Sequence, residues 1–116
     1  ALAIVPEKAW ADMSEEERKS LGTKPVKQLQ ITQEMRQKAF DNYETQDDHG
    51  MHVIGLTKDQ NDTPYYLVKN SWGKESNQCD GYFYASESYV QFKTTSIMLH
   101  KKAIPPAIAK KLGIAQ

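Results

Sequence analysis

Two short stretches of the sequence carry residues that could act together in acid-base chemistry. The first is "DDHGMHVIGL", in which His49 follows two aspartates, and the second is "YYLVKNSWG", which holds Asn70 and Trp72. An imidazole that is hydrogen-bonded through one nitrogen to an amide oxygen presents its other nitrogen to a neighbouring nucleophile. These residue types predict the His and Asn part of a Cys/His/Asn site, with Trp72 covering their hydrogen bond.

Both stretches have the composition of β-strands. "MHVIGL" and "PYYLVKNSW" are rich in β-branched and aromatic residues, and the polar "KDQNDT" between them predicts an antiparallel hairpin. The midpoint between His49 and Asn70 falls inside this turn, so antiparallel pairing would place the two side by side. Trp72 would share a strand face with Asn70, because side chains two apart point the same way.

The first half of the chain predicts two helices joined by an extended segment. Ser14 and Glu17 have the spacing of a capping box, for a helix that ends near Leu21. "TKPVKQLQ" reads as a linker, because a proline disfavours helix in the residue before it. A second helix follows Thr32, and we expect its helically spaced residues to pack in the core: Met35, Ala39, Phe40 and Tyr43.

The second half predicts further short strands at "GYFYAS" and "TTSIMLH", with a helical turn around "SESYVQ" between them. "IPPAIAKKLG" has prolines at a helix start and Gly113 at its end, followed by a free tail of residues 114–116. The expected fold class is therefore α+β, with an antiparallel sheet and flanking helices.

The composition limits the classes of partner. A chain of 116 residues suits one domain, and fifteen Lys plus Arg against fifteen Asp plus Glu leave no basic field for nucleic acid or a membrane surface. No apolar run approaches the roughly 20 residues of a membrane span. The single cysteine, Cys79, excludes an internal disulfide and a multi-cysteine zinc site. It leaves the compartment open, with a cytoplasmic location favoured over an exported one.

The candidate residues also have plainer interpretations. A histidine beside Asp47 and Asp48 can be a solvated turn residue, and "NSWG" can be a strand end with a tight turn. A metal site through His49 and His52 is disfavoured, because residues three apart on a strand face opposite ways. Cys79 lacks a glycine-rich lead or a helix start that would lower its pKa, which favours an ordinary loop thiol.

The two stretches resemble the His and Asn segments of papain-like cysteine peptidases, and in detail the bleomycin hydrolase or aminopeptidase C branch. The resemblance runs from about Thr32 to the end, including "GYFYAS" and "IPPAIAKKLGIAQ". It implies His49 as general base and acid, Asn70 as its orienting residue, and Trp72 with Asp48 as supporting residues. It also implies the β-barrel-like C-terminal half of the peptidase fold, peptide substrates, possible homo-oligomers and no metal or organic cofactor.

The sequence departs from this family at the nucleophile. Nothing here resembles the family's Gln and Cys-Gly-Ser-Cys-Trp segments, and far fewer residues precede His49 than the roughly 130 to 150 that separate cysteine and histidine in papain relatives. We therefore expect residues 1–116 to be a single C-terminal domain or fragment without the nucleophile-bearing part. Alone it would be inactive as a peptidase; the alternative is a non-catalytic module that binds a peptide or a partner.

Overall fold

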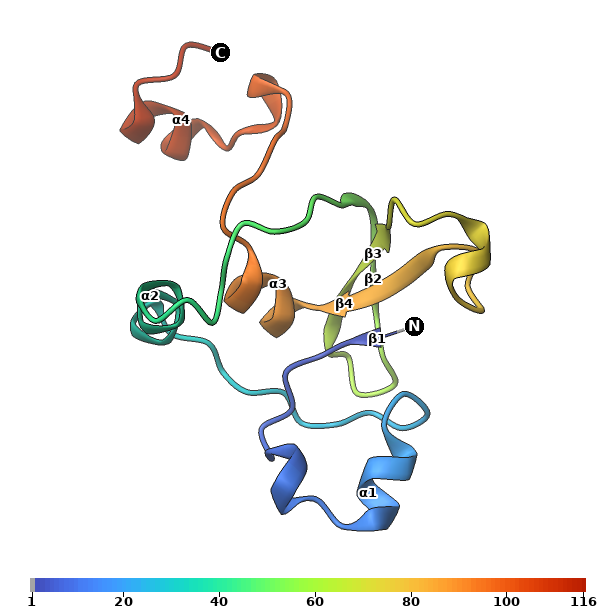
Figure 1. The fold of residues 1–116 in the computed structure, drawn as a ribbon. Helices are drawn as coiled ribbons and strands as arrows, with labels where there is room; N and C mark the ends of the chain where they lie inside the picture. The colour runs from blue at the N-terminus through green and yellow to red at the C-terminus, as the bar shows by residue number, and fades with distance from the viewer. Residues whose placement is uncertain (1) are drawn as a thin grey trace.

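The structure is a computed structural model, which describes residues 2–116. It contains short strands, α-helices and 3₁₀ turns (Figure 1). In chain order these are β1 (Leu2–Ala3), η1 (Trp10–Asp12), α1 (Glu15–Ser20), α2 (Gln33–Asp41), β2 (His52–Lys58), β3 (Pro64–Lys69), η2 (Lys74–Ser76), β4 (Tyr82–Ser86), α3 (Glu87–Lys93), η3 (Lys101–Ala103) and α4 (Pro106–Leu112). The expected α+β class is confirmed.

The four strands form one sheet in the order β1-β4-β3-β2. β3 is antiparallel to both of its neighbours, but β1 runs parallel to β4, so the sheet is mixed and the prediction of a purely antiparallel sheet is wrong. The parallel pair arises because β1 comes from the start of the chain and is not joined to β4 by a hairpin. α3 packs against β3, β4 and α2.

The predicted hairpin is present, but its register differs from the one expected. His52 pairs with Lys69 and Val53 with Val68, whereas the midpoint argument places Leu67 opposite His52. An irregularity between Val53 and Gly55 shifts the pairing by one residue along β2. The turn is held by Asp59, whose carboxylate accepts hydrogen bonds from the backbone N–H groups of Asn61 and Thr63.

The helix starts predicted from local signals are confirmed. Ser14 caps α1 in a capping box with Glu17, and the Thr32 hydroxyl accepts a hydrogen bond from the N–H of Met35 at the start of α2. The Ser14 N–H, with Lys8 beside it, holds the pKa of Glu17 below its ordinary value. α4 begins at Pro106, with Pro105 at its cap position, and is ended by Gly113 in a left-handed conformation, as expected.

The predicted apolar stripe on α2 is largely solvent-facing. Ala39 is buried, Met35 is half-buried, and Phe40 and Tyr43 are exposed. Tyr43 lies beyond the helix in a left-handed conformation and is 77% exposed. The prediction that the whole stripe packs in the core is therefore wrong, because α3 covers only one side of this short helix.

Residues 94–116 form an arm that projects from the end of α3 (Figure 1). "TTSIMLH" is extended but pairs with no described strand, so the predicted strand is absent. The tail is not free, because the Gln116 side chain donates a hydrogen bond to the carbonyl of Lys101 and the backbone N–H of Ile114 donates one to the carbonyl of Ala109. The radius of gyration is 16.1 Å. A compact domain of this length would have about 13 Å, so the chain is elongated.

One buried hydrogen-bond network joins the start of the chain to the sheet and α3. The Ser86 side chain is 0% exposed; it accepts from the N–H of Tyr89 and donates to the Gln28 side chain, whose oxygen also accepts from the N–H of Val5. Ser86 thus caps α3 and ties two distant segments together. Among residues 2–116, no helix is long and apolar enough to cross a membrane.

We expect Ser86→Ala to destabilise the fold by about 1–2 kcal/mol, because it leaves the N–H of Tyr89 without its cap and removes one of the two donors to the Gln28 oxygen. Urea unfolding followed by circular dichroism measures the change. Ser88→Ala, in the same helix and without a hydrogen bond from its side chain among the described residues, is the matched control and should be nearly neutral. Equal effects of the two substitutions would contradict the role of the network.

Candidate active site

The structure brings His49 and Asn70 together at the open end of the β2–β3 hairpin. His49 lies three residues before β2, and Asn70 follows β3 directly. Their side chains meet with His49 Nε2 2.7 Å from Asn70 Oδ1, so the contact expected from the sequence is present. It forms beyond the paired residues, so the shift in register does not prevent it.

A backbone group fixes which atom of Asn70 faces the histidine. The N–H of Ser71 lies 2.8 Å from Asn70 Oδ1 and can only donate, so this atom is the amide oxygen. An amide oxygen only accepts, and therefore His49 Nε2 must carry the hydrogen. In the neutral ring, Nδ1 then holds the lone pair and can take a proton. The geometry thus selects one tautomer and assigns the basic nitrogen.

Trp72 lies against the His49 ring on the same side of the hairpin end. The two ring centroids are 5.3 Å apart and the planes are tilted by 33°, which is a favourable aromatic arrangement. Extending the pairing of Val53 with Val68 outward places His49 opposite Trp72, which explains their proximity. Trp72 is nevertheless 71% exposed, so its outer face is open to solvent in this chain.

The loop of residues 70–81 holds Asn70 in place through contacts that were not predicted from the sequence. The N–H of Asn70 donates to the carbonyl of Gly81, and the Asn77 side chain accepts from the N–H groups of Cys79 and Gly81. Gly81 has φ +85°, and a Cβ there would lie 2.6 Å from the carbonyl oxygen of Gly73. The Asp-Gly pair at 80–81 is the signal that could have indicated this tight turn.

The other candidate residues lie outside the contact between His49 and Asn70. Asp48 is exposed and forms no hydrogen bond or ion pair with the residues that the structure describes. His52 begins β2 opposite Lys69. Cys79 is half-buried in the loop before β4. No group of three or more His, Cys, Asp or Glu side chains within residues 2–116 is arranged to hold a metal ion.

Comparison with known proteins decides the family. The model of the Peptidase C1-like family matches residues 20–114, which is most of the chain. The chain belongs to the Peptidase C1-like family. A comparison with curated proteins finds no match.

This membership makes the Peptidase C1-like chain a relative of cysteine peptidases, and the family match spans both stretches that carry His49 and Asn70. The small mixed sheet with its helices is compatible with a domain of that family. The end of the match, residue 114, lies in the arm. The C-terminus sits at the far side of this arm, well away from β2 and β3 (Figure 1).

We expect the ring of His49 to exist mainly as the Nε2–H tautomer when it is neutral, because Asn70 Oδ1 accepts that hydrogen. Nitrogen-15 NMR of the imidazole distinguishes the two tautomers. Asn70→Ala should reduce this preference. His52, whose ring makes no hydrogen bond with the described residues, is an internal control whose spectrum should not change. A tautomer ratio at His49 that is the same with and without Asn70 would contradict the assignment.

We expect Gly81→Ala to destabilise the protein by about 1–3 kcal/mol from backbone strain alone, with a further cost from the overlap with Gly73. Gly22→Ala is the matched control, since Gly22 has φ +88° with nothing within 4 Å of an added Cβ. Urea unfolding should therefore show a clearly larger decrease in the free energy of unfolding for Gly81→Ala than for Gly22→Ala. Equal decreases would mean that the close contact between Gly81 and the Gly73 carbonyl does not limit the residue at position 81.

Proposed function

We propose that this chain supplies the His and Asn half of a cysteine peptidase active site, with His49 as general base and acid and Asn70 as the residue that orients it. The observation that carries the proposal is the hydrogen bond from His49 Nε2 to Asn70 Oδ1, whose direction is fixed by the Ser71 N–H. Membership of the Peptidase C1-like family supports it.

The geometry fits a two-step hydrolysis of a peptide bond. His49 Nδ1 removes the proton from a cysteine thiol, and the thiolate attacks the carbonyl carbon. The protonated imidazole then gives its proton to the leaving amine as the peptide bond breaks. In the second step the same nitrogen takes a proton from water, which attacks the thioester and releases the acid and the thiol. Asn70 holds the ring in the required tautomer in both steps.

The nucleophile in this proposal is an upstream cysteine, supplied by a peptidase portion outside residues 1–116. Cys79 lies on the loop that positions Asn70, with its backbone N–H bound to Asn77, and it is not placed in the reaction. Together the two portions would form the family's cleft, with the sheet described here completing a barrel-like half. The resemblance to the bleomycin hydrolase or aminopeptidase C branch favours release of residues from a free N-terminus.

A second candidate function is a non-catalytic module that binds a peptide or a partner. It is favoured by the large apolar side chains exposed on β2 and before it, namely Met51, Val53, Ile54 and Leu56. In the first proposal, the peptidase portion that carries the cysteine would cover the same apolar side chains. The two proposals differ in whether the longer reading frame, or a co-purifying chain, contains a cysteine segment that can reach His49 Nδ1.

The test of the catalytic proposal uses the longest protein encoded by the reading frame. In that protein we expect His49→Ala to lower kcat for a peptide substrate by about 100 to 10,000-fold, which is the usual contribution of a positioned acid-base group. Asn70→Ala should cause a smaller loss, since the ring remains but is no longer held in one tautomer. Wild-type activity in His49→Ala would favour the binding module.

The isolated chain of 116 residues should hydrolyse no peptide, because a base without a nucleophile forms no acyl intermediate. Release of a fluorescent amine from an aminoacyl amide, with and without a thiol-alkylating reagent, measures this directly. Thiol-dependent turnover that is abolished in Cys79→Ala would overturn the assignment of the nucleophile to another segment. Adding the upstream portion as a separate polypeptide is expected to restore turnover.

A further inference from the structure

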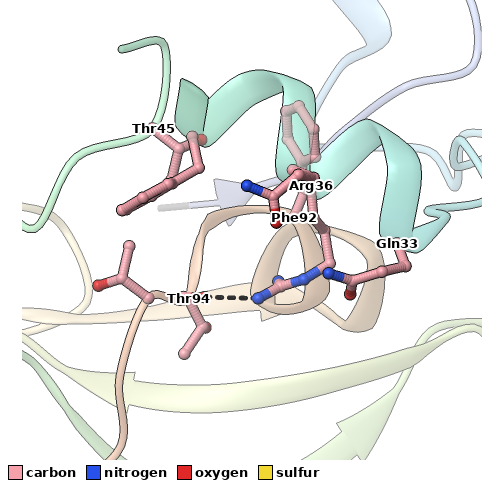
Figure 2. Close-up of a pocket in the computed structure, with 8 residues that line it drawn as sticks. Gln33, Arg36, Thr45, Phe92 and Thr94 are labelled. Atoms are coloured by element: carbon pink, nitrogen blue, oxygen red, sulfur yellow. Dashed lines mark hydrogen bonds between the residues drawn. The ribbon is translucent and has the colours of Figure 1, made fainter. Parts of the chain in front are cut away.

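A cavity of about 110 Å³ lies between α2 and the end of α3, and none of the residues that line it takes part in the contact between His49 and Asn70. Its lining comes from both helices and from the segments that follow them (Figure 2). A cavity of this size has room for several water molecules or for one small polyatomic ligand. Its wall contains no aspartate or glutamate, and the one charged side chain in the wall is that of Arg36.

Arg36 is half-buried and has no acidic partner. Its Nη2 donates to the carbonyl of Thr94 at 3.0 Å, and it forms no ion pair with any carboxylate within residues 2–116. A guanidinium carries several N–H donors, and one carbonyl oxygen uses only part of them. A positive charge that is partly withdrawn from water is usually balanced by a negative one. The cavity therefore contains a cation with unused donors and no counter-charge.

Neutral donors lie around the same cavity. The Thr45 side chain is only 7% exposed, and its hydroxyl oxygen accepts a hydrogen bond from Lys93 Nζ at 3.3 Å. That bond uses a lone pair of the oxygen, so the hydroxyl hydrogen of Thr45 can still be donated, and it has no acceptor among the described residues. The side chains of Thr94, Thr95 and Gln33 also line the cavity and can donate.

Acidic residues that are close in the chain do not fill the cavity. Asp41 accepts a hydrogen bond from the Gln37 side chain at 2.8 Å, and Glu44 accepts one from the Asn42 side chain at 3.0 Å. Glu34 follows Gln33 on α2 and is exposed. None of these three carboxylates belongs to the wall. The described chain thus supplies no anion of its own to Arg36.

We propose that this cavity binds one small oxyanion, a carboxylate or a phosphate group, through the Arg36 guanidinium and the Thr45 hydroxyl. The planar donor fork of arginine matches both groups in geometry. Phe40 and Phe92 form the apolar part of the wall, and the lower dielectric beside them strengthens charge-assisted hydrogen bonds. The site uses neither His49 nor Asn70, so it is independent of the proposed catalytic function.

The binding test uses the longest protein that the reading frame encodes, labelled with nitrogen-15 in arginine. Inorganic phosphate and, separately, acetate are titrated at constant ionic strength kept with NaCl, and NMR follows the Nε–H signals. We expect a saturable shift of the Arg36 signal with a dissociation constant of about 1 mM or lower for at least one anion. Arg18, which donates to the carbonyls of Trp10 and Ala11, is the internal control and should not respond.

The two titrations distinguish the two kinds of ligand. Saturation by phosphate alone assigns a phosphate group, saturation by acetate alone assigns a carboxylate, and saturation by both assigns a general oxyanion site. A shift that NaCl alone reproduces would overturn the proposal. The absence of a saturable Arg36 shift up to about 50 mM of either anion, some fifty times the expected dissociation constant, would also overturn it.

Two pairs of variants test which groups hold the anion. Arg36→Gln should weaken binding, measured by isothermal titration calorimetry, at least about tenfold, because the charge-assisted hydrogen bonds are lost. Lys38→Gln removes the same charge from the opposite face of α2, outside the cavity, and should leave the dissociation constant unchanged.

The second pair keeps Arg36 and its bond to Thr94. Gln33→Glu places a competing carboxylate on the wall and should also weaken binding at least about tenfold; it suits the fold, because an acidic residue is favourable in the first turn of a helix. Gln91→Glu makes the same change at an exposed position of α3 outside the wall and is its control. Equal effects of variant and control in either pair would overturn the assignment of the anion to this cavity.

Discussion

The antiparallel pairing of β2 with β3 is the constraint on which the candidate site depends. It carries His49 and Asn70 to the same end of a hairpin although twenty residues lie between them, and it aligns them without requiring either residue to be in a strand. The pairing itself rests on β3, which is bonded to a strand on each side and whose own residues Tyr65 and Val68 are buried. The backbone hydrogen bonds between β2 and β3 therefore determine where His49 and Asn70 lie relative to each other.

Features governed by neighbouring residues were predictable from the sequence. The caps of Ser14 and Thr32, the glycine stop at Gly113 and the two hairpin strands follow from side chains that act on the backbone within a few residues. The contact of His49 with Asn70 was also predictable, because a hairpin needs only a turn in the right place. The Ser71 N–H, which determines the tautomer, has no side-chain signature and could not be read from the sequence.

Features governed by distant partners were not predictable. The parallel placement of β1 beside β4 depends on a buried network through Gln28 and Ser86, which are 58 residues apart in the chain. "TTSIMLH" has the composition of a strand, but a high β propensity does not supply a partner. No neighbouring strand within the described residues pairs with it. The exposure of Phe40 on α2 and of Tyr43 just after it has the same cause, because their spacing is helical but no described element covers them.

The self-contained turn at Asp59 has a consequence for how this part of the chain can vary. Its carboxylate bonds to Asn61 and Thr63 close the hairpin locally, at the opposite end of β2 and β3 from His49. Insertions at residues 60–62 would replace these local bonds but would leave the histidine and asparagine in place, because the paired strands lie between the turn and the site. A one-residue deletion inside β2 would instead change which side chains face the core along the rest of the strand. Within such hairpins, natural variation in length should accumulate at the turn, while the strands keep their phase.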